Sequence, residues 1–188
     1  MTDSGYWQTD TEHDAIHAIA AASEFLAEVQ SRRYYWRWFV LAMHAAVQGS
    51  LTLALTNGDT VHVQTPGVSS RMLSAFDGKN DFPNPHMDNF LRLYHKAKHG
   101  EFLRPHATPL PANDIHERAL KSLDEMRDEL VHFNSKSWSL EVELILDTAR
   151  TSCEVLDHLF SNGAIFWRQH DSPSTASRAL DSLRTALA

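Results

Sequence analysis

Apolar residues recur along most of the chain at the spacing of α-helices. From about residue 11 to residue 29, Ile16, Ile19 and Leu26 share one face of a predicted helix. The stretch from about residue 33 to residue 55 is apolar on nearly all sides, which predicts a helix at the centre of the fold. Gly58, in "TNGD", suits the left-handed residue that ends many helices.

Two more amphipathic stretches lie in the second half of the chain. One opens at "NDIHE", where Asp114 can cap a helix and Glu117 follows three positions later. Its predicted apolar stripe consists of Ile115, Ala119, Leu123, Met126 and Leu130. The other follows "SWSL", and its stripe consists of Ile145, Ala149, Cys153, Leu156 and Phe160. Asn162 and Gly163 form its natural end.

The intervening segments are less regular. Proline and glycine interrupt residues 56–86 repeatedly, although "TVHVQT" allows a short strand. A shorter helix is predicted around "MDNFLRLYHKAK", followed by a proline-rich connection. We therefore predict an all-α fold, a helical bundle of four main helices plus a short additional helix. A single domain would cover residues 1–165, and a tail, 166–188, would hold a short peripheral helix or be partly disordered.

Composition supports one well-packed domain. The chain has 188 residues, of which 43% are apolar, with 5 Trp and 9 Phe, which is enough for a full core. A net charge of -7 argues against a broad basic surface that grips long nucleic acid, but it allows a local phosphate site.

The second apolar stretch is long enough to cross a bilayer. It carries His44 and Gln48, however, and "RRYYWRW" precedes it, so a buried helix is the better interpretation. The first residues, "MTDSGYWQTDTEHD", are acidic and polar, unlike a signal peptide. We expect a soluble cytoplasmic protein that does not contact a membrane.

Metal and thiol chemistry have little support. Cys153 is the one cysteine and lies in an apolar run, which favours a packed, inert thiol. His13 with His17 and His95 with His99 have the spacing of a helical metal-binding pair. Such pairs arise easily among 12 histidines, and no HExxH pattern accompanies them. We expect no metal and no cofactor.

The segment "RDELVHF" holds an arginine and a histidine near a helix end. Their spacing alone does not single them out, because three pairs have four to six intervening residues: Arg37–His44, Arg92–His99 and Arg127–His132. In a regular helix Arg127 and His132 would lie about 140° apart around the axis. They meet only if the helix ends near His132 or if a second copy of the chain supplies the partner, and "FNSKS" favours an end.

With its surroundings the motif is more specific. "MRDELVHF" follows an aromatic-rich helix and precedes "HFNSKSWSLEV", which leads into another apolar helix. This order, over roughly residues 33–160, resembles the HEPN superfamily of α-helical bundles. The resemblance implies a metal-independent endoribonuclease with its site at a homodimer interface. It also implies the role of a toxin or defence effector, with a cognate antitoxin or regulatory protein as partner. RNA would be its substrate.

Carried onto this chain, the resemblance implies that Arg127 and His132 are the catalytic pair and that Asp128 is the polar residue after the arginine. Asp128 stands where the family more commonly has asparagine, and a carboxylate beside a phosphate is unfavourable unless a base neutralises it. The chemistry fits: imidazole titrates near neutrality, and a guanidinium holds two phosphate oxygens. Lys136, just beyond the motif, would add attraction for phosphate.

A structural interpretation stands beside the catalytic one. Arg127 has Asp124 three residues before it as an ion-pair partner, and His132 suits the C-terminus of a helix. Lys96 and Lys98, in a locally basic stretch, form either a strip that contacts RNA or a solvated helix face. The alternative function is a non-catalytic HEPN-like module that binds a nucleotide or a protein.

Overall fold

The computed structural model describes residues 5, 7–132, 137 and 139–188. In this part the chain forms seven α-helices and one short 3-10 helix, η1 (Gly100–Phe102). The α-helices are α1 (Thr11–Glu28), α2 (Tyr35–Leu55), α3 (Pro66–Phe76), α4 (Phe90–Ala97), α5 (Asp114–Val131), α6 (Val142–Ser161) and α7 (Ser172–Leu187). The described residues contain no strand, and one isolated bridge joins Gln64 to Met87. The predicted all-α bundle is confirmed.

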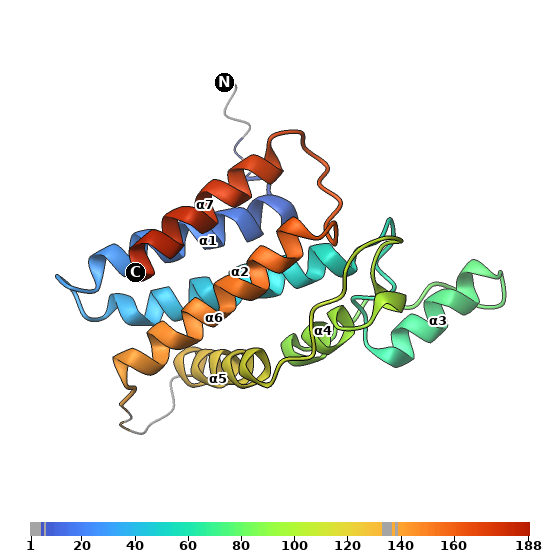
Figure 1. The fold of residues 1–188 in the computed structure, drawn as a ribbon. Helices are drawn as coiled ribbons and strands as arrows, with labels where there is room; N and C mark the ends of the chain where they lie inside the picture. Colours follow the sequence, from blue (N-terminus) through green and yellow to red (C-terminus); the bar gives the residue numbers. More distant parts are fainter. Residues whose placement is uncertain (1–4, 6, 133–136, 138) are drawn as a thin grey trace.

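Helix α2 is the central element. It packs against α1, α4, α5 and α6, and α7 covers α1 and α6 (Figure 1). Among the described helices, α2 is the one that is long and apolar enough to cross a membrane, judged by length and composition alone. In its most apolar 18-residue stretch, however, 61% is buried inside the bundle. Burial among its neighbours therefore accounts for the hydrophobicity of α2.

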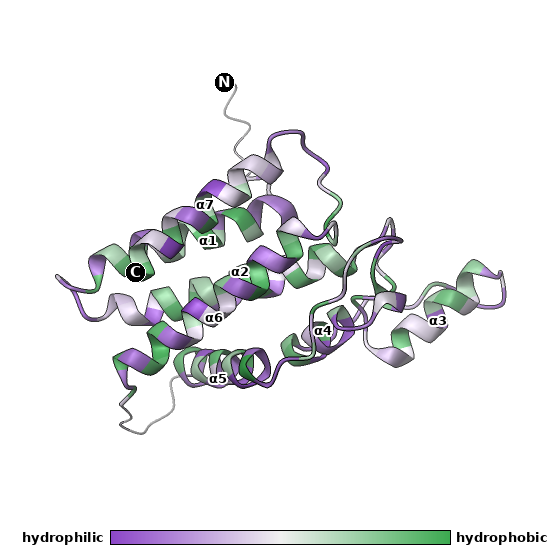
Figure 2. Cartoon of the chain, viewed as in Figure 1, coloured by the Kyte–Doolittle hydropathy of each residue, from purple (hydrophilic) through white to green (hydrophobic). Residues whose placement is uncertain are grey.

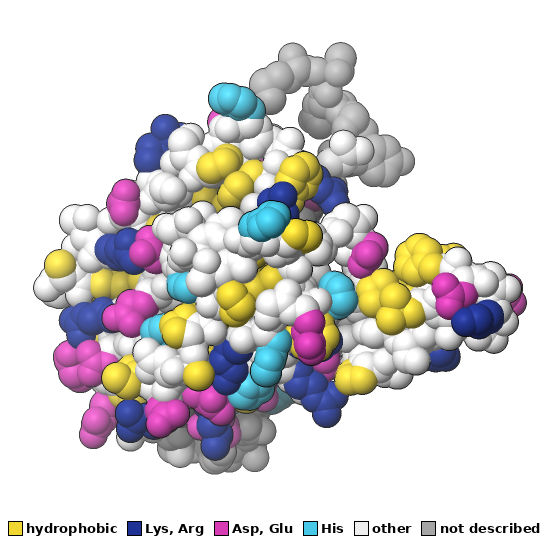
Figure 3. All heavy atoms as spheres, turned by 45° about the vertical axis from the view of Figure 1, so that its right-hand side comes forward, with side chains coloured by type: hydrophobic (Ala, Val, Ile, Leu, Met, Phe, Trp, Pro, Cys, Tyr) yellow, Lys and Arg dark blue, Asp and Glu magenta, His cyan; other side chains and the backbone are white. Residues whose placement is uncertain are grey.

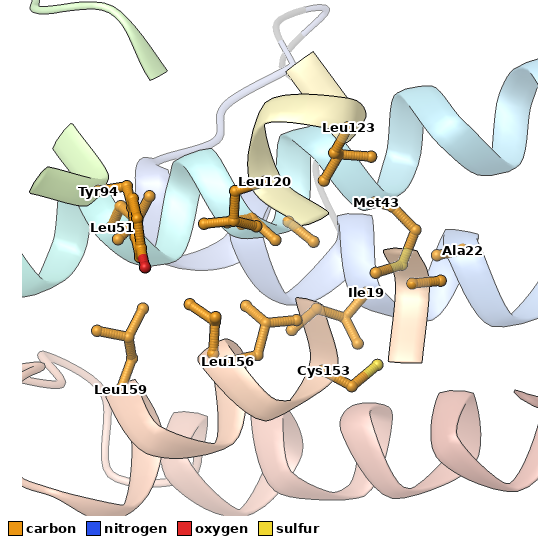
Figure 4. Packing of buried hydrophobic residues seen from close by; sticks show 14 of the residues in the cluster. Ile19, Ala22, Met43, Leu51, Tyr94, Leu120, Leu123, Cys153, Leu156 and Leu159 are labelled. Atoms are coloured by element: carbon orange, nitrogen blue, oxygen red, sulfur yellow. The ribbon is translucent and has the colours of Figure 1, made fainter. Parts of the chain in front are cut away.

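One core joins the helices of the bundle. Ile19 of α1, Leu51 of α2 and Leu156 of α6 lie within it, and Figure 4 shows their side chains between the ribbons. The tail region contributes to the same core through Leu180 and Leu183 of α7. The apolar sides of α1 and α7 face inward, and their polar residues lie outside (Figure 2).

The buried face of α5 differs from the predicted stripe by one position. His116 and Leu120 are buried, whereas Ile115 is 57% exposed. Leu123 and Met126 lie on both the predicted and the observed buried face, and they are buried as predicted. The register that includes Leu120 buries a large leucine in place of alanine, so it removes more apolar surface from water.

The segment 56–86 was expected to be irregular, and this was wrong for its middle part. Pro66 begins α3, because proline at a first helical position removes no hydrogen bond that the helix needs. The stretch 60–65 forms turns in place of the short strand. Helix α3 projects from the bundle (Figure 1), and exposed apolar side chains, Phe76 and Phe82 among them, gather on this projection (Figure 3).

Two local features fix the ends of helices. Gly163, with φ 70°, directly follows the C-cap residue Asn162 and provides the left-handed residue expected after α6. Gly58 also has positive φ, 89°, but it lies two residues beyond Thr56, the extended C-cap of α2. Glu12, in the first turn of α1, is 3% exposed. Its carboxylate accepts hydrogen bonds from the backbone N–H groups of Arg168 (2.9 Å) and Gln169 (3.2 Å), which ties α1 to the segment before α7.

Candidate functional site

Arg127 lies on α5 in a cluster of polar side chains. Its Nη2 donates to Asp124 Oδ1 (2.9 Å), its Nη1 pairs with Asp128 Oδ1 (2.7 Å), and its Nε donates to His44 Nε2 (3.3 Å). The ion pair with Asp124, which helical spacing allows, is thus present. The Arg127 side chain is 29% exposed, so the cluster lies at the border between core and solvent.

His44, from α2, is the buried member of the cluster. Its side chain is 5% exposed, and its ring stacks on Phe90 of α4 with 4.2 Å between centroids. Nε2 lies 3.0 Å from Asp124 Oδ1. Burial lowers the pKa of His44 below its ordinary value, the positive charge of Arg127 lowers it further, and the contact with Asp124 opposes both effects. His44 is therefore neutral at physiological pH.

The sequence places His44 by a simple rule. It follows Arg37 by seven residues, or two helical turns, so both side chains lie on the same face of α2. Arg37 Nη2 donates to the backbone oxygen of Leu130, and His44 contacts Asp124, so this face of α2 lies along α5. His44 was not singled out as a site residue from the sequence, although a histidine inside an apolar helix needs a polar partner and is a signal that could have indicated it.

His132 is the residue that caps the C-terminus of α5. The helix ends at Val131, as predicted from the turn-forming residues, and the His132 backbone N–H donates to Asp128 O (3.2 Å). His132 is exposed. Within the described residues, no hydrogen bond or ion pair joins it to Arg127. The catalytic role of this pair stays a prediction.

Asp128 determines the charge of the cluster. Its side chain is 54% exposed, and it pairs with the guanidinium that would have to neutralise it. One positive charge on Arg127 stands against two negative charges on Asp124 and Asp128, so with neutral His44 the cluster carries one net negative charge. An open depression of about 460 Å³ beside Asp128 is acidic as well, since Glu125 and Glu129 line it.

The predicted RNA-binding lysines of α4 have partners elsewhere. Lys96 Nζ donates to the backbone oxygens of His62 (2.9 Å) and Gln64 (2.6 Å) and pairs with Asp88 (2.9 Å). Lys98, at the end of α4, pairs with Glu117 at 3.1 Å. Lys136 lies outside the described residues.

The residues considered for metal or thiol chemistry either contact carboxylates or are buried in the core. His13 contacts Asp10 at 3.0 Å, and His95 approaches Glu117 at 3.9 Å. No group of three or more metal-binding side chains occurs among the residues that the structure describes. Cys153 is 2% exposed, and burial raises the pKa of its thiol to about 12, so it is the packed, unreactive thiol that its apolar surroundings predict.

Comparison with models of known families, with curated proteins and with solved structures gave no match.

Proposed function

We propose that the protein is a metal-independent endoribonuclease of the HEPN type that acts as a homodimer in the cytoplasm. The observation that supports this most is the way Arg127 is held. Its contacts with described residues use one hydrogen on each guanidinium nitrogen, which leaves one on Nη1 and one on Nη2. The guanidinium is partly exposed, and an arginine can bind two oxygens of a phosphodiester at once.

The reaction needs no metal ion. The 2′-hydroxyl of RNA attacks the adjacent phosphorus, a base takes its proton, and an acid protonates the departing 5′-oxygen, which leaves a 2′,3′-cyclic phosphate. In the proposed roles, His132 is the base or acid, and Arg127 stabilises the charge that develops on the phosphate oxygens. Imidazole serves either role because both of its protonation states are accessible near neutral pH.

A second copy of the chain would complete the site. His132 is exposed, and no hydrogen bond or ion pair joins it to Arg127 among the described residues, so a two-fold interface that includes the end of α5 would bring two guanidiniums and two imidazoles to one cleft. Acid and base would then come from different chains. Because such an enzyme would damage cellular RNA, we also propose that an antitoxin or another regulatory protein controls it.

The test is cleavage of a fluorescent, unstructured RNA in EDTA by the purified protein. We expect wild type to cut the RNA and both Arg127→Ala and His132→Ala to lose at least about 100-fold in rate, the lower end for loss of acid–base help. Arg118→Ala is the matched control, because Arg118 lies on the same helix and donates to the backbone oxygen of Asp114. It should cut at the wild-type rate.

Two results would contradict the nuclease proposal. One is intact RNA after incubation with folded wild-type protein at micromolar concentration. The other is equal cutting by wild type, Arg127→Ala and His132→Ala, which would indicate a contaminating nuclease. Sedimentation equilibrium tests the dimer separately, and a monomer at the assay concentration would contradict the shared cleft.

A non-catalytic HEPN-like module is the second candidate, and the charges around Arg127 favour it. Two carboxylates already neutralise the guanidinium, and the adjacent depression is acidic. Such a surface suits a cationic protein partner better than RNA. The same assay separates the two candidates: this one predicts intact RNA from a folded protein, whereas cleavage that depends on Arg127 contradicts it.

A further inference from the structure

The Nε2 atom of His44 lies near two groups, Asp124 Oδ1 and Arg127 Nε, and it cannot form a hydrogen bond with both at the same time. When Nε2 carries no hydrogen, it accepts the Nε–H of Arg127 at 3.3 Å. When it carries a hydrogen, it donates to Asp124 Oδ1 at 3.0 Å, and the Nε–H of Arg127 then faces another N–H group. The neutral ring takes either role, according to which ring nitrogen carries its hydrogen, whereas the protonated ring carries hydrogen on both nitrogens and can only donate to Asp124.

We propose that His44 is a positioning residue for Arg127: the neutral ring with its hydrogen on Nδ1 holds the Nε–H of Arg127, and protonation, which places a hydrogen on Nε2, directs the ring to Asp124 and releases that Nε–H of Arg127 to a phosphate group of RNA. This inference rests on the proposed function, because it regulates the same site. It concerns a side chain of α2 that does not belong to the Arg–His motif of α5.

Charge acts in the same direction as geometry. The charged groups that face the His44 ring, Asp124, Arg127 and Asp128, all come from α5, and α4 contributes the apolar ring of Phe90. With neutral His44 the cluster has a net charge of -1, from one guanidinium and two carboxylates. Protonation brings it to zero, which removes the repulsion of a phosphate. Burial and Arg127 lower the pKa of His44, so this change takes place below about pH 6.5.

The thermodynamic consequence is reciprocal. If protonated His44 favours phosphate at Arg127, then a bound phosphodiester must favour protonated His44. Uptake of one proton on binding changes the affinity by up to about tenfold per pH unit within the window in which His44 titrates. A ring that only packs against Phe90 would produce no such dependence.

The experiment uses fluorescence anisotropy with a labelled 2′-O-methyl oligouridylate, which lacks the attacking hydroxyl and has no group that titrates in the pH window in which His44 titrates. We expect wild type to bind more tightly as the pH falls. His44→Gln, whose side chain stays neutral, should lose at least half of this slope. His116→Gln should keep it, because His116 is also a buried histidine but contacts Glu154 in place of Arg127.

A measurement on wild type alone does not depend on the variants' folding. NMR titration of the His44 ring, with and without the oligonucleotide, should show a higher pKa in the complex. An unchanged His44 pKa, equal pH slopes in wild type and His44→Gln, or no binding at any pH would each overturn the proposal. Cleavage of RNA together with a pH-independent affinity would overturn the role of His44 but keep the nuclease. Binding that depends on pH in this way, without cleavage of RNA, would support the role of His44 and contradict the nuclease.

Discussion

Lys96 and Asp88 form a buried ion pair whose loss should destabilise the whole fold. The Lys96 side chain is 13% exposed and that of Asp88 is 1% exposed. The Lys96 ammonium donates hydrogen bonds to the backbone oxygens of His62 and Gln64 and forms an ion pair with Asp88 Oδ2 at 2.9 Å. These contacts attach the segment before α3 to α4.

Lys96→Met keeps the aliphatic stem but leaves the Asp88 carboxylate and two carbonyl groups without this partner. Removal of one member of a buried pair lowers the free energy of unfolding by about 3–5 kcal/mol. That is a large part of the ~5–15 kcal/mol that a domain has in total. Urea titration followed by far-UV circular dichroism measures the change. Lys79→Met is the matched control, because Lys79 pairs with Asp77 on the surface, and its loss should be under about 0.5 kcal/mol.

The charge left on Asp88 supplies the decisive comparison. Adding Asp88→Asn to Lys96→Met removes that charge, so the double variant should be more stable than Lys96→Met alone. A loss below about 1 kcal/mol for Lys96→Met would refute the reasoning and show that Asp88 is hydrated. The same variant tests the RNA-binding role of Lys96, because a folded Lys96→Met protein with weakened RNA binding would support that role.

Three further predictions follow from buried groups. Tyr94→Phe should raise the free energy of unfolding by about 1 kcal/mol in urea titrations, because the buried Tyr94 hydroxyl has no partner among the described residues. Gly49→Ala should lower the thermal midpoint in calorimetry, because its Cβ would lie 2.9 Å from the Cβ of Ala15. Gly67→Ala is the control and should leave the midpoint unchanged, because the space around Gly67 is open. Adding Ala15→Gly to Gly49→Ala should restore the midpoint. Since burial lowers the pKa of His44, the unfolded chain takes up a proton more readily as the pH falls below about 6.5, so wild-type stability in urea should fall with pH in that window. His44→Gln should lose this part of the pH dependence, and an unchanged dependence would contradict the buried, neutral ring.

The amphipathic helices were predictable because a period of 3.6 residues leaves a clear pattern. The end of α6 followed from Gly163. Helix α3 was not recognised because Pro66 and Gly67 look like helix breakers, although proline at the first position starts this helix. The choice between Ile115 and Leu120 on α5 depends on which neighbours pack against the helix, and periodicity alone leaves both registers possible.

The candidate site was predictable in its local part only. Asp124 lies three residues before Arg127, so their ion pair follows from helix geometry. His44 lies 83 residues before Arg127 in the chain, and nothing in the spacing connects them. The contact between them arises from the packing of α2 on α5. His132 followed the expectation for a helix end, but its partner, if it lies in another copy, belongs to the assembly and not to one chain.

The carboxylate of Glu12 also bears on the order in which the chain folds during synthesis. Its backbone partner on Arg168 lies 156 residues later, so α1 emerges from the ribosome long before the groups that satisfy this buried charge exist. The central helix α2 and its contacts with α5 form from segments made earlier, whereas the first turn of α1 must stay hydrated until Arg168 and Gln169 have been made. In a nascent chain stalled before this segment, the cluster around Arg127 would already be present, but α1 would lack the partners of Glu12 and the cover that α7 provides.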